Sequence, residues 1–159
     1  MGLEGVAGFL RRHRKIALDS SVFIYQLEAN PKYVAFTDPV FAWLERRHAR
    51  AVTSTVTMTE LLVPPYRDSN QARVRAFYAL LSTCPNLDWI APNLEIADTA
   101  ARLRALHRIG TPDALQSATA IHAQATGLLT NDAVFARVAE FETLVLDTLL
   151  WSRSLWRSG

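Results

Sequence analysis

The chain has 159 residues, half of them hydrophobic and a fifth charged, with a formal net charge of +2. This composition is typical of one compact domain with a buried core, and it excludes a disordered or low-complexity chain. The single cysteine, Cys84, excludes an intramolecular disulfide and a cysteine-based zinc site, and no apolar run approaches the roughly 18 residues of a membrane span.

Residues 11–15 read Arg-Arg-His-Arg-Lys and form the most basic run of the chain. Such a run is most often a solvated segment, and contact with phosphate is the less favoured alternative. All of the seventeen basic residues except Lys15 and Lys32 are Arg, which suits bidentate contact with phosphate. A net charge of +2 does not by itself indicate nucleic acid.

Short apolar runs alternate with helix signals in the first half of the chain. Ile16 to Leu18 predicts a buried strand, and the two serines that follow Asp19 predict a helix to Leu27. Asp38-Pro39 predicts the next helix, with Asp38 as its cap and Pro39 in its first position. Residues 51–56 are rich in β-branched side chains and predict a second strand, followed by a short helix that Pro64-Pro65 stops.

The same alternation continues in the second half. In chain order we expect a helix over 68–82, a strand over 87–91, a helix from Pro92 to a C-cap at Gly110, a helix from Thr111 to about Thr126, a strand over 128–130, a helix over 133–141 and a strand over 143–147. This order is typical of an α/β fold whose parallel sheet is covered by helices on both faces. We expect one domain over 1–159, with a core at about 16–147 and an extension over 148–159 that carries Trp151 and Trp156 in a helix or ordered segment.

Four acidic residues are expected at one edge of this sheet. Asp19 directly follows the first strand, Glu60 comes soon after the second, Asp132 follows the fourth, and Asp113 lies in the first turn of the helix before the fourth. Ligands of open parallel sheets bind beyond the carboxyl ends of the strands. Because converging carboxylates repel one another unless cations neutralise them, this pattern predicts a Mg²⁺ or Mn²⁺ site suited to metal-assisted hydrolysis of a phosphodiester.

Three of these residues also have a structural interpretation. Asp113 could complement the dipole of its helix, Glu60 matches a capping box with Thr57, and Asp132 could cap the helix that follows Asn131. Asp19 is the hardest to explain in this way, because an unpaired charge at the end of an apolar strand is costly to desolvate. If one of the four is structural, we expect it to be Glu60.

Four motifs stand in a specific order. They are Leu18-Asp-Ser-Ser-Val-Phe-Ile-Tyr25, Thr59-Glu-Leu-Leu62, Thr111-Pro-Asp-Ala-Leu-Gln-Ser-Ala-Thr-Ala120 and Leu128-Leu-Thr-Asn-Asp-Ala-Val-Phe135. Over about residues 16–147 they resemble the PIN-domain ribonucleases, and most closely the VapC-type toxins of prokaryotic toxin–antitoxin pairs. Many relatives carry Thr where this chain has Ser20. Some relatives also have a further acidic residue in the last motif, and because this chain lacks it, Asp132 is the one acidic residue of that motif.

The resemblance implies a PIN-like three-layer α/β fold with a parallel five-stranded sheet in the order 3-2-1-4-5. It implies a Mg²⁺- or Mn²⁺-dependent endoribonuclease that cuts structured RNA such as tRNA or rRNA. It also implies an antitoxin partner, a homodimer and a cytoplasmic location without membrane association. The catalytic and metal-binding residues would be Asp19, Glu60, Asp113 and Asp132, supported by Ser21, Thr130 and Asn131.

Other α/β classes fit less well. A haloacid-dehalogenase-type phosphatase needs a second Asp where Ser21 stands, a phospho-receiver domain needs a Lys near its last strand, and a Rossmann domain needs glycines after its first strand. The remaining alternative is a PIN-like module that binds RNA or a protein without cleavage. Four mutually repelling carboxylates argue against it, since a binding module has little use for them.

Overall fold

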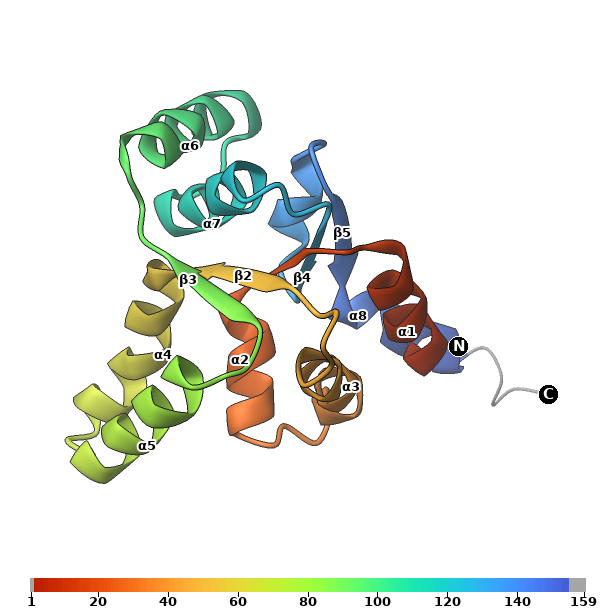
Figure 1. Ribbon diagram of the computed structural model, residues 1–159, viewed down its shortest axis with the longest axis vertical. Coiled ribbons are helices and arrows are strands. Elements are labelled where there is room, and N and C mark those ends of the chain that lie inside the picture. The colour runs from red at the N-terminus through yellow and green to blue at the C-terminus, as the bar shows by residue number, and fades with distance from the viewer. Residues whose placement is uncertain (1, 155–159) are drawn as a thin grey trace.

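Five parallel strands form a sheet in the order β3-β2-β1-β4-β5 in the computed structural model, which describes residues 2–154 and the side chains of 4–150 (Figure 1). The strands are β1 (Ile16–Leu18), β2 (Ala51–Ser54), β3 (Leu87–Ile90), β4 (Gly127–Thr130) and β5 (Glu142–Val145). All four pairings between neighbouring strands are parallel, so the predicted fold class and strand order are confirmed.

Helices cover both faces of this sheet. They are α1 (Gly2–Arg12), α2 (Ser20–Leu27), α3 (Val34–Leu44), α4 (Thr55–Arg67), α5 (Gln71–Ser82), α6 (Leu94–His107), α7 (Thr111–His122), the 3₁₀ helix η1 (Ala133–Arg137) and α8 (Leu146–Ser154). Figure 1 shows α6 and α7 on one side of the sheet and α2 and α3 on the other. None of the described helices is long and apolar enough to cross a lipid bilayer.

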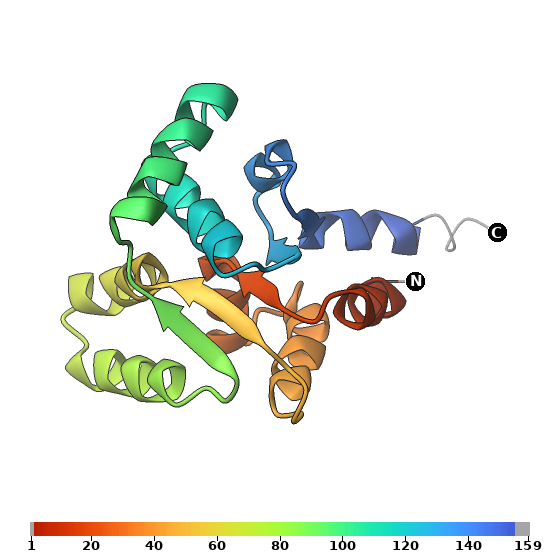
Figure 2. The same ribbon diagram turned by 45° about the horizontal axis from the view of Figure 1, so that its top comes forward.

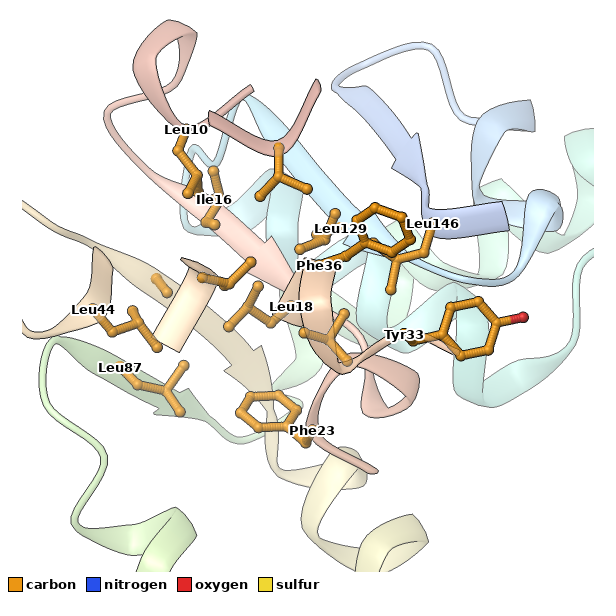
Figure 3. Packing of buried hydrophobic residues seen from close by; sticks show 14 of the residues in the cluster. Leu10, Ile16, Leu18, Phe23, Tyr33, Phe36, Leu44, Leu87, Leu129 and Leu146 are labelled. Atoms are coloured by element: carbon orange, nitrogen blue, oxygen red, sulfur yellow. The ribbon is translucent and has the colours of Figure 1, made fainter. Parts of the chain in front are cut away.

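Strand β1 is buried from both sides because its side chains alternate between two hydrophobic clusters. Ile16 and Leu18 join the cluster under α1 to α5 and α8, whereas Ala17 joins the one under α6, α7 and η1. Figure 3 shows Ile16 and Leu18 packed with Leu129 of β4 and with Phe23 and Phe36 from α2 and α3. The apolar run 16–18 is therefore a buried strand, as predicted, and it is the central strand of the sheet.

Two predicted helix boundaries at proline are wrong. Helix α3 begins at Val34 rather than at Asp38-Pro39, and α4 continues through Pro64-Pro65 to Arg67. An interior proline removes a backbone hydrogen bond, which local sequence rules read as a boundary. Tertiary packing compensates here, since Phe36, Val40 and Leu44 recur at helical spacing and are all completely buried.

Other boundaries shift by a few residues. Strand β2 ends at Ser54 rather than Val56, and the C-cap of α6 is Arg108, whose φ of 53° is left-handed. Gly110 is the N-cap of α7 and not the C-cap of α6. The helix predicted over 133–141 is a short 3₁₀ helix, and the strand predicted over 143–147 is β5 followed by the start of α8. The predicted extension begins within α8, and Trp156 lies outside the described residues.

The basic run 11–15 is only partly solvated, which corrects the prediction. Arg12 ends α1, and the ring of His13 is buried between Thr126 and Glu142, to which its nitrogens hydrogen-bond at 2.9 and 2.6 Å. Gly127 makes room for this contact, because a Cβ there would lie 2.9 Å from the His13 ring. The segment therefore anchors α1 to the β4–β5 side of the sheet.

Candidate active site

The four predicted carboxylates lie on elements that meet at the carboxyl edge of the sheet (Figure 2). Asp19 is the N-cap of α2 directly after β1, and Asp132 is the N-cap of η1 two residues after β4. Glu60 lies in α4, which follows β2 directly, and Asp113 lies in the first turn of α7. The charges of Asp132, Asp19 and Glu60 all raise the pKa of Asp113, so the four groups share one electrostatic environment.

Asp19 is the most buried of the four, with 7% of its surface exposed. Its Oδ2 accepts hydrogen bonds from the Thr130 and Ser21 hydroxyls at 2.8 and 3.1 Å, and it makes no side-chain cap bond to α2. Burial raises the pKa of Asp19, although these hydrogen bonds oppose the rise. Its carboxylate is thus held in place by hydroxyls and is not used to cap a helix.

Glu60 is not a helix cap, so the capping-box alternative is wrong. The N-cap of α4 is Ser54, whose Oγ accepts from the Val56 N–H, and Thr57 lies inside the helix. The Glu60 Oε2 instead accepts a hydrogen bond from the Ser20 Oγ at 3.0 Å. Partial burial raises the pKa of Glu60, with a further contribution from the charge of Asp19. Ser20 directly follows Asp19, and its hydroxyl therefore holds Glu60 near the Asp19 carboxylate.

Asp113 has the most strongly perturbed carboxyl group. Its pKa is raised to about 6, first by partial burial and then by the three neighbouring carboxylates. A helix N-terminus would lower the pKa of a first-turn Asp, so the helix-dipole interpretation is outweighed here. Among the described residues, no group donates a hydrogen bond to this carboxylate.

Asp132 is the member that has a structural role. Its Oδ1 accepts a hydrogen bond from the Val134 N–H at 3.0 Å and so caps η1, as the alternative interpretation allowed. The Asp132 N–H donates to Thr130 Oγ1 at 2.9 Å. The helix-capping bond therefore belongs to Asp132 and not to Glu60.

The three predicted supporting residues are all in contact with this edge. Ser21 Oγ donates to Asp19 and accepts from the Asn131 N–H at 3.0 Å. The Asn131 side chain donates to the Tyr25 hydroxyl at 2.9 Å and accepts from the Asp147 N–H at 2.8 Å. Thr130 and Ser21 thus hold Asp19, while Asn131 ties the β4 loop to α2 and to the start of α8.

Gln116 is a structural contributor that the sequence did not single out. It is buried on α7, three residues after Asp113, where its Nε2 donates to the Leu18 carbonyl and its Oε1 accepts from the Ser54 N–H at 2.9 Å. Thr53 Oγ1 also donates to the Leu18 carbonyl, at 2.8 Å. The paired residues of β1 and β2 end before Leu18, so side chains replace the backbone ladder directly beneath Asp19. A polar residue at helical spacing from Asp113 was the signal for this role.

The donor set fits a hard divalent cation. All four carboxylates supply oxygen, which suits Mg²⁺ or Mn²⁺ and not a softer metal. Within residues 2–154, no three His, Cys, Asp or Glu side chains are grouped closely enough to hold a metal ion by themselves. The carboxylates are nevertheless near enough to raise the pKa of Asp113. Mg²⁺ needs only one or two carboxylates and keeps several waters, so both observations fit it.

The sheet order and the acidic edge define an α/β protein with a candidate cation site at the carboxyl ends of its strands. The family model of the PIN domain matches residues 16–141, and the chain therefore belongs to the PIN domain family. No curated protein matches the chain at a significant level.

Several solved structures share the fold. A chain of VapBC2 from Rickettsia felis, bound to a DNA fragment from its promoter, is 16% identical with a TM-score of 0.66, over 82% of this chain and 98% of that one. A chain of VapBC-1 from nontypeable Haemophilus influenzae is 23% identical with a TM-score of 0.64, over 84% and 98%. A chain of FitAcB from Neisseria gonorrhoeae is 19% identical with a TM-score of 0.61, over 82% and 97%. At these identities the similarity establishes the fold.

Proposed function

We propose that this protein is a metal-dependent endoribonuclease that acts as the toxin of a toxin–antitoxin pair. The observation that carries the proposal is that Asp132, Asp19 and Glu60 lie near enough to raise the pKa of Asp113 at one edge of a PIN-domain sheet. Carboxylates that raise one another's pKa destabilise the ionised site unless a cation binds there. The similar folds seen in VapBC and FitAcB structures support the toxin assignment.

In this proposal Asp19, Glu60, Asp113 and Asp132 hold Mg²⁺ or Mn²⁺. The bound ions would activate a water molecule and stabilise the negative charge that develops on the phosphate. The protein's own hydroxyls set the geometry: Thr130 and Ser21 orient Asp19, and Ser20 orients Glu60. Because the orienting groups are buried or part-buried, the carboxylates are arranged before substrate binds.

The substrate and partners follow from the same proposal. We infer that the substrate is structured RNA such as tRNA or rRNA, that the protein acts in the cytoplasm as one domain, and that an antitoxin protein and a second copy of the chain bind to it. Two exposed apolar side chains of α4, Val63 and Tyr66, line one surface pocket together with Met58 and Leu62. Such a grouping supports a protein partner, because a monomer rarely leaves several apolar side chains together in water.

The test is cleavage of total RNA by the purified protein with Mg²⁺ or Mn²⁺, beside Asp19→Asn and Asp98→Asn. Asp98 is an exposed carboxylate on α6 and is the matched control. We expect Asp19→Asn to lose more than the roughly 100-fold that loss of a supporting residue causes, and Asp98→Asn to stay active. Equal cleavage by wild type and Asp19→Asn would refute the site, and no cleavage across a broad RNA panel would favour a non-catalytic binding module.

A further inference from the structure

A basic groove of about 550 Å³ lies between the end of α1 and the end of α3. Its cations are Arg11, Arg14, Lys15, Arg47 and Arg50, and no carboxylate lines it. The rings of Trp43 and His48 also line this groove. We refer to these seven side chains as the basic groove.

The basic groove is at the opposite end of the sheet from the carboxylates. Lys15 immediately precedes β1 and Arg50 immediately precedes β2, whereas Asp19 directly follows β1. Figure 2 shows α1 and α3 at the end where β1 and β2 begin, and α4 and α7 at the end to which the arrowheads point. Asp19 lies four positions after Lys15 along extended chain, which corresponds to about 13 Å at ~3.3 Å per residue. The groove is therefore a separate site and not part of the acidic one.

The helix ends do not account for this charge. Each helix C-terminus carries about half a negative charge, so the ends of α1 and α3 together balance about one of the five cations. The nearby carboxylate of Glu142 is already engaged by Arg12 and His13, and the Arg12 hydrogen bond is the main reason that its pKa is lowered. A surplus of positive charge remains in the groove.

Several cations in the groove have free hydrogen-bonding capacity. Lys15 donates to the Ala123 carbonyl and Arg50 to the Ala49 carbonyl. Among the described residues, the guanidinium groups of Arg11, Arg14 and Arg47 have no hydrogen-bond or ion-pair partner. Unpaired guanidinium groups that converge on one groove are suited to bidentate contact with phosphate.

We propose that the basic groove binds the phosphate backbone of a single-stranded segment of the RNA substrate, as an anchoring site remote from the carboxylates. This inference rests on the proposed function in that RNA is the polyanion the enzyme meets. Proteins bind single-stranded nucleic acid with cations that contact the backbone and with aromatic rings on which the bases stack. The basic groove contains both, since Trp43 and His48 line it together with the five cations. An acidic peptide would use the cations but has no need of the rings.

The experiment measures binding without cleavage. Fluorescence anisotropy of a labelled poly(U) RNA is followed in EDTA over a series of salt concentrations, with Arg14→Ala/Arg47→Ala beside wild type. The matched control is Arg75→Ala/Arg102→Ala, which removes the same charge from exposed positions on α5 and α6. Loss of two phosphate contacts should weaken binding and reduce the slope of log K against log salt by about 1.4, whereas the control should keep the wild-type slope. Thermal melts establish that both variants are folded.

Three results would overturn the proposal. They are no binding of poly(U) by wild type at low salt, the same slope for the groove variant as for wild type, and tighter binding of a labelled poly-glutamate peptide than of RNA. Cleavage is measured separately with Mg²⁺. If the wild type cuts RNA and the groove variant binds RNA as tightly as the wild type, the groove proposal alone is refuted. If the groove variant binds RNA more weakly but the wild type does not cut RNA, the proposed nuclease activity alone is refuted.

Discussion

The Thr130 hydroxyl joins the Asp19 carboxylate to the backbone of Asp132 through a single oxygen. Its Oγ1 donates to Asp19 Oδ2 at 2.8 Å and accepts from the Asp132 N–H at 2.9 Å. Thr130 is fully buried, so water does not replace either bond if the hydroxyl is lost. The geometry of β1 and β4 at the acidic edge therefore depends on one side chain that is not acidic.

Thr130→Val keeps the shape of the side chain and removes both hydrogen bonds. We expect a loss of about 1–3 kcal/mol of stability, because Asp19 and the Asp132 N–H lose their partner in a buried place. RNA cleavage should fall by about 10- to 100-fold. Urea denaturation and a cleavage assay measure the two effects. Thr99→Val on α6 is the control, and a Thr130→Val protein that cleaves like wild type would contradict the positioning role.

Asp113→Asn should stabilise the metal-free protein at pH 7. The folded pKa of about 6 lies above the ordinary 3.8, so ionised Asp113 opposes folding, by at most about 3 kcal/mol for a shift of about two units. The contribution of the protonated carboxyl is complete below pH 3.8 and is lost as the pH rises through about 6. The advantage of the variant should therefore shrink as the pH falls from 7 to 4. Denaturation in EDTA across this range tests it, and a variant less stable than wild type at pH 7 would count against it.

Divalent metal should raise the melting temperature of the wild-type protein. A cation that binds only the folded state stabilises it by RT ln(1 + [L]/Kd), and here it also relieves repulsion among the carboxylates. Differential scanning fluorimetry against Mn²⁺ concentration measures the rise. Asp19→Asn should show a smaller rise and Asp98→Asn the full one. The absence of any shift at millimolar Mn²⁺ would argue against a cation site.

Gln116→Leu should destabilise the protein and lower its activity together. The substitution leaves the Ser54 N–H without its partner and removes a donor to the Leu18 carbonyl, beneath Asp19. One unsatisfied buried group costs about 1–3 kcal/mol. Gln71→Leu, at an exposed position at the start of α5, is the control. Activity retained at a temperature where the variant is fully folded would show that Gln116 only stabilises the sheet.

Gly127→Ala should destabilise the protein although Gly127 does not have a positive φ. Its new Cβ would lie 2.6 Å from Phe9 Cζ and 2.9 Å from the His13 ring, both of which are buried. Overpacking of this kind costs about 1–3 kcal/mol. In Gly110→Ala the nearest atom is 3.9 Å away, so this control should be nearly neutral. Equal melting temperatures for the two variants would show that α1 moves aside easily.

The sequence by itself determined the strands and the acidic motifs. Strand β1 was predicted with its observed bounds, because a short apolar run between polar residues has few alternatives in a buried sheet. Asp19, Glu60, Asp113 and Asp132 were found by their positions after strands or at a helix start. The alternation of elements also predicted parallel pairing, which brings the carboxyl ends of the strands to one edge.

Helix boundaries and the roles of individual residues required the tertiary structure. Pro39 and Pro64 lie inside helices because burial of an apolar face outweighs one lost backbone hydrogen bond, and local propensity does not contain that term. Glu60 is not a capping residue because β2 ends at Ser54, two residues earlier than predicted, and Ser54 caps α4. The capping alternative holds for Asp132. The contacts of Gln116 and the basic groove join segments that are far apart in the chain, and only folding brings them together.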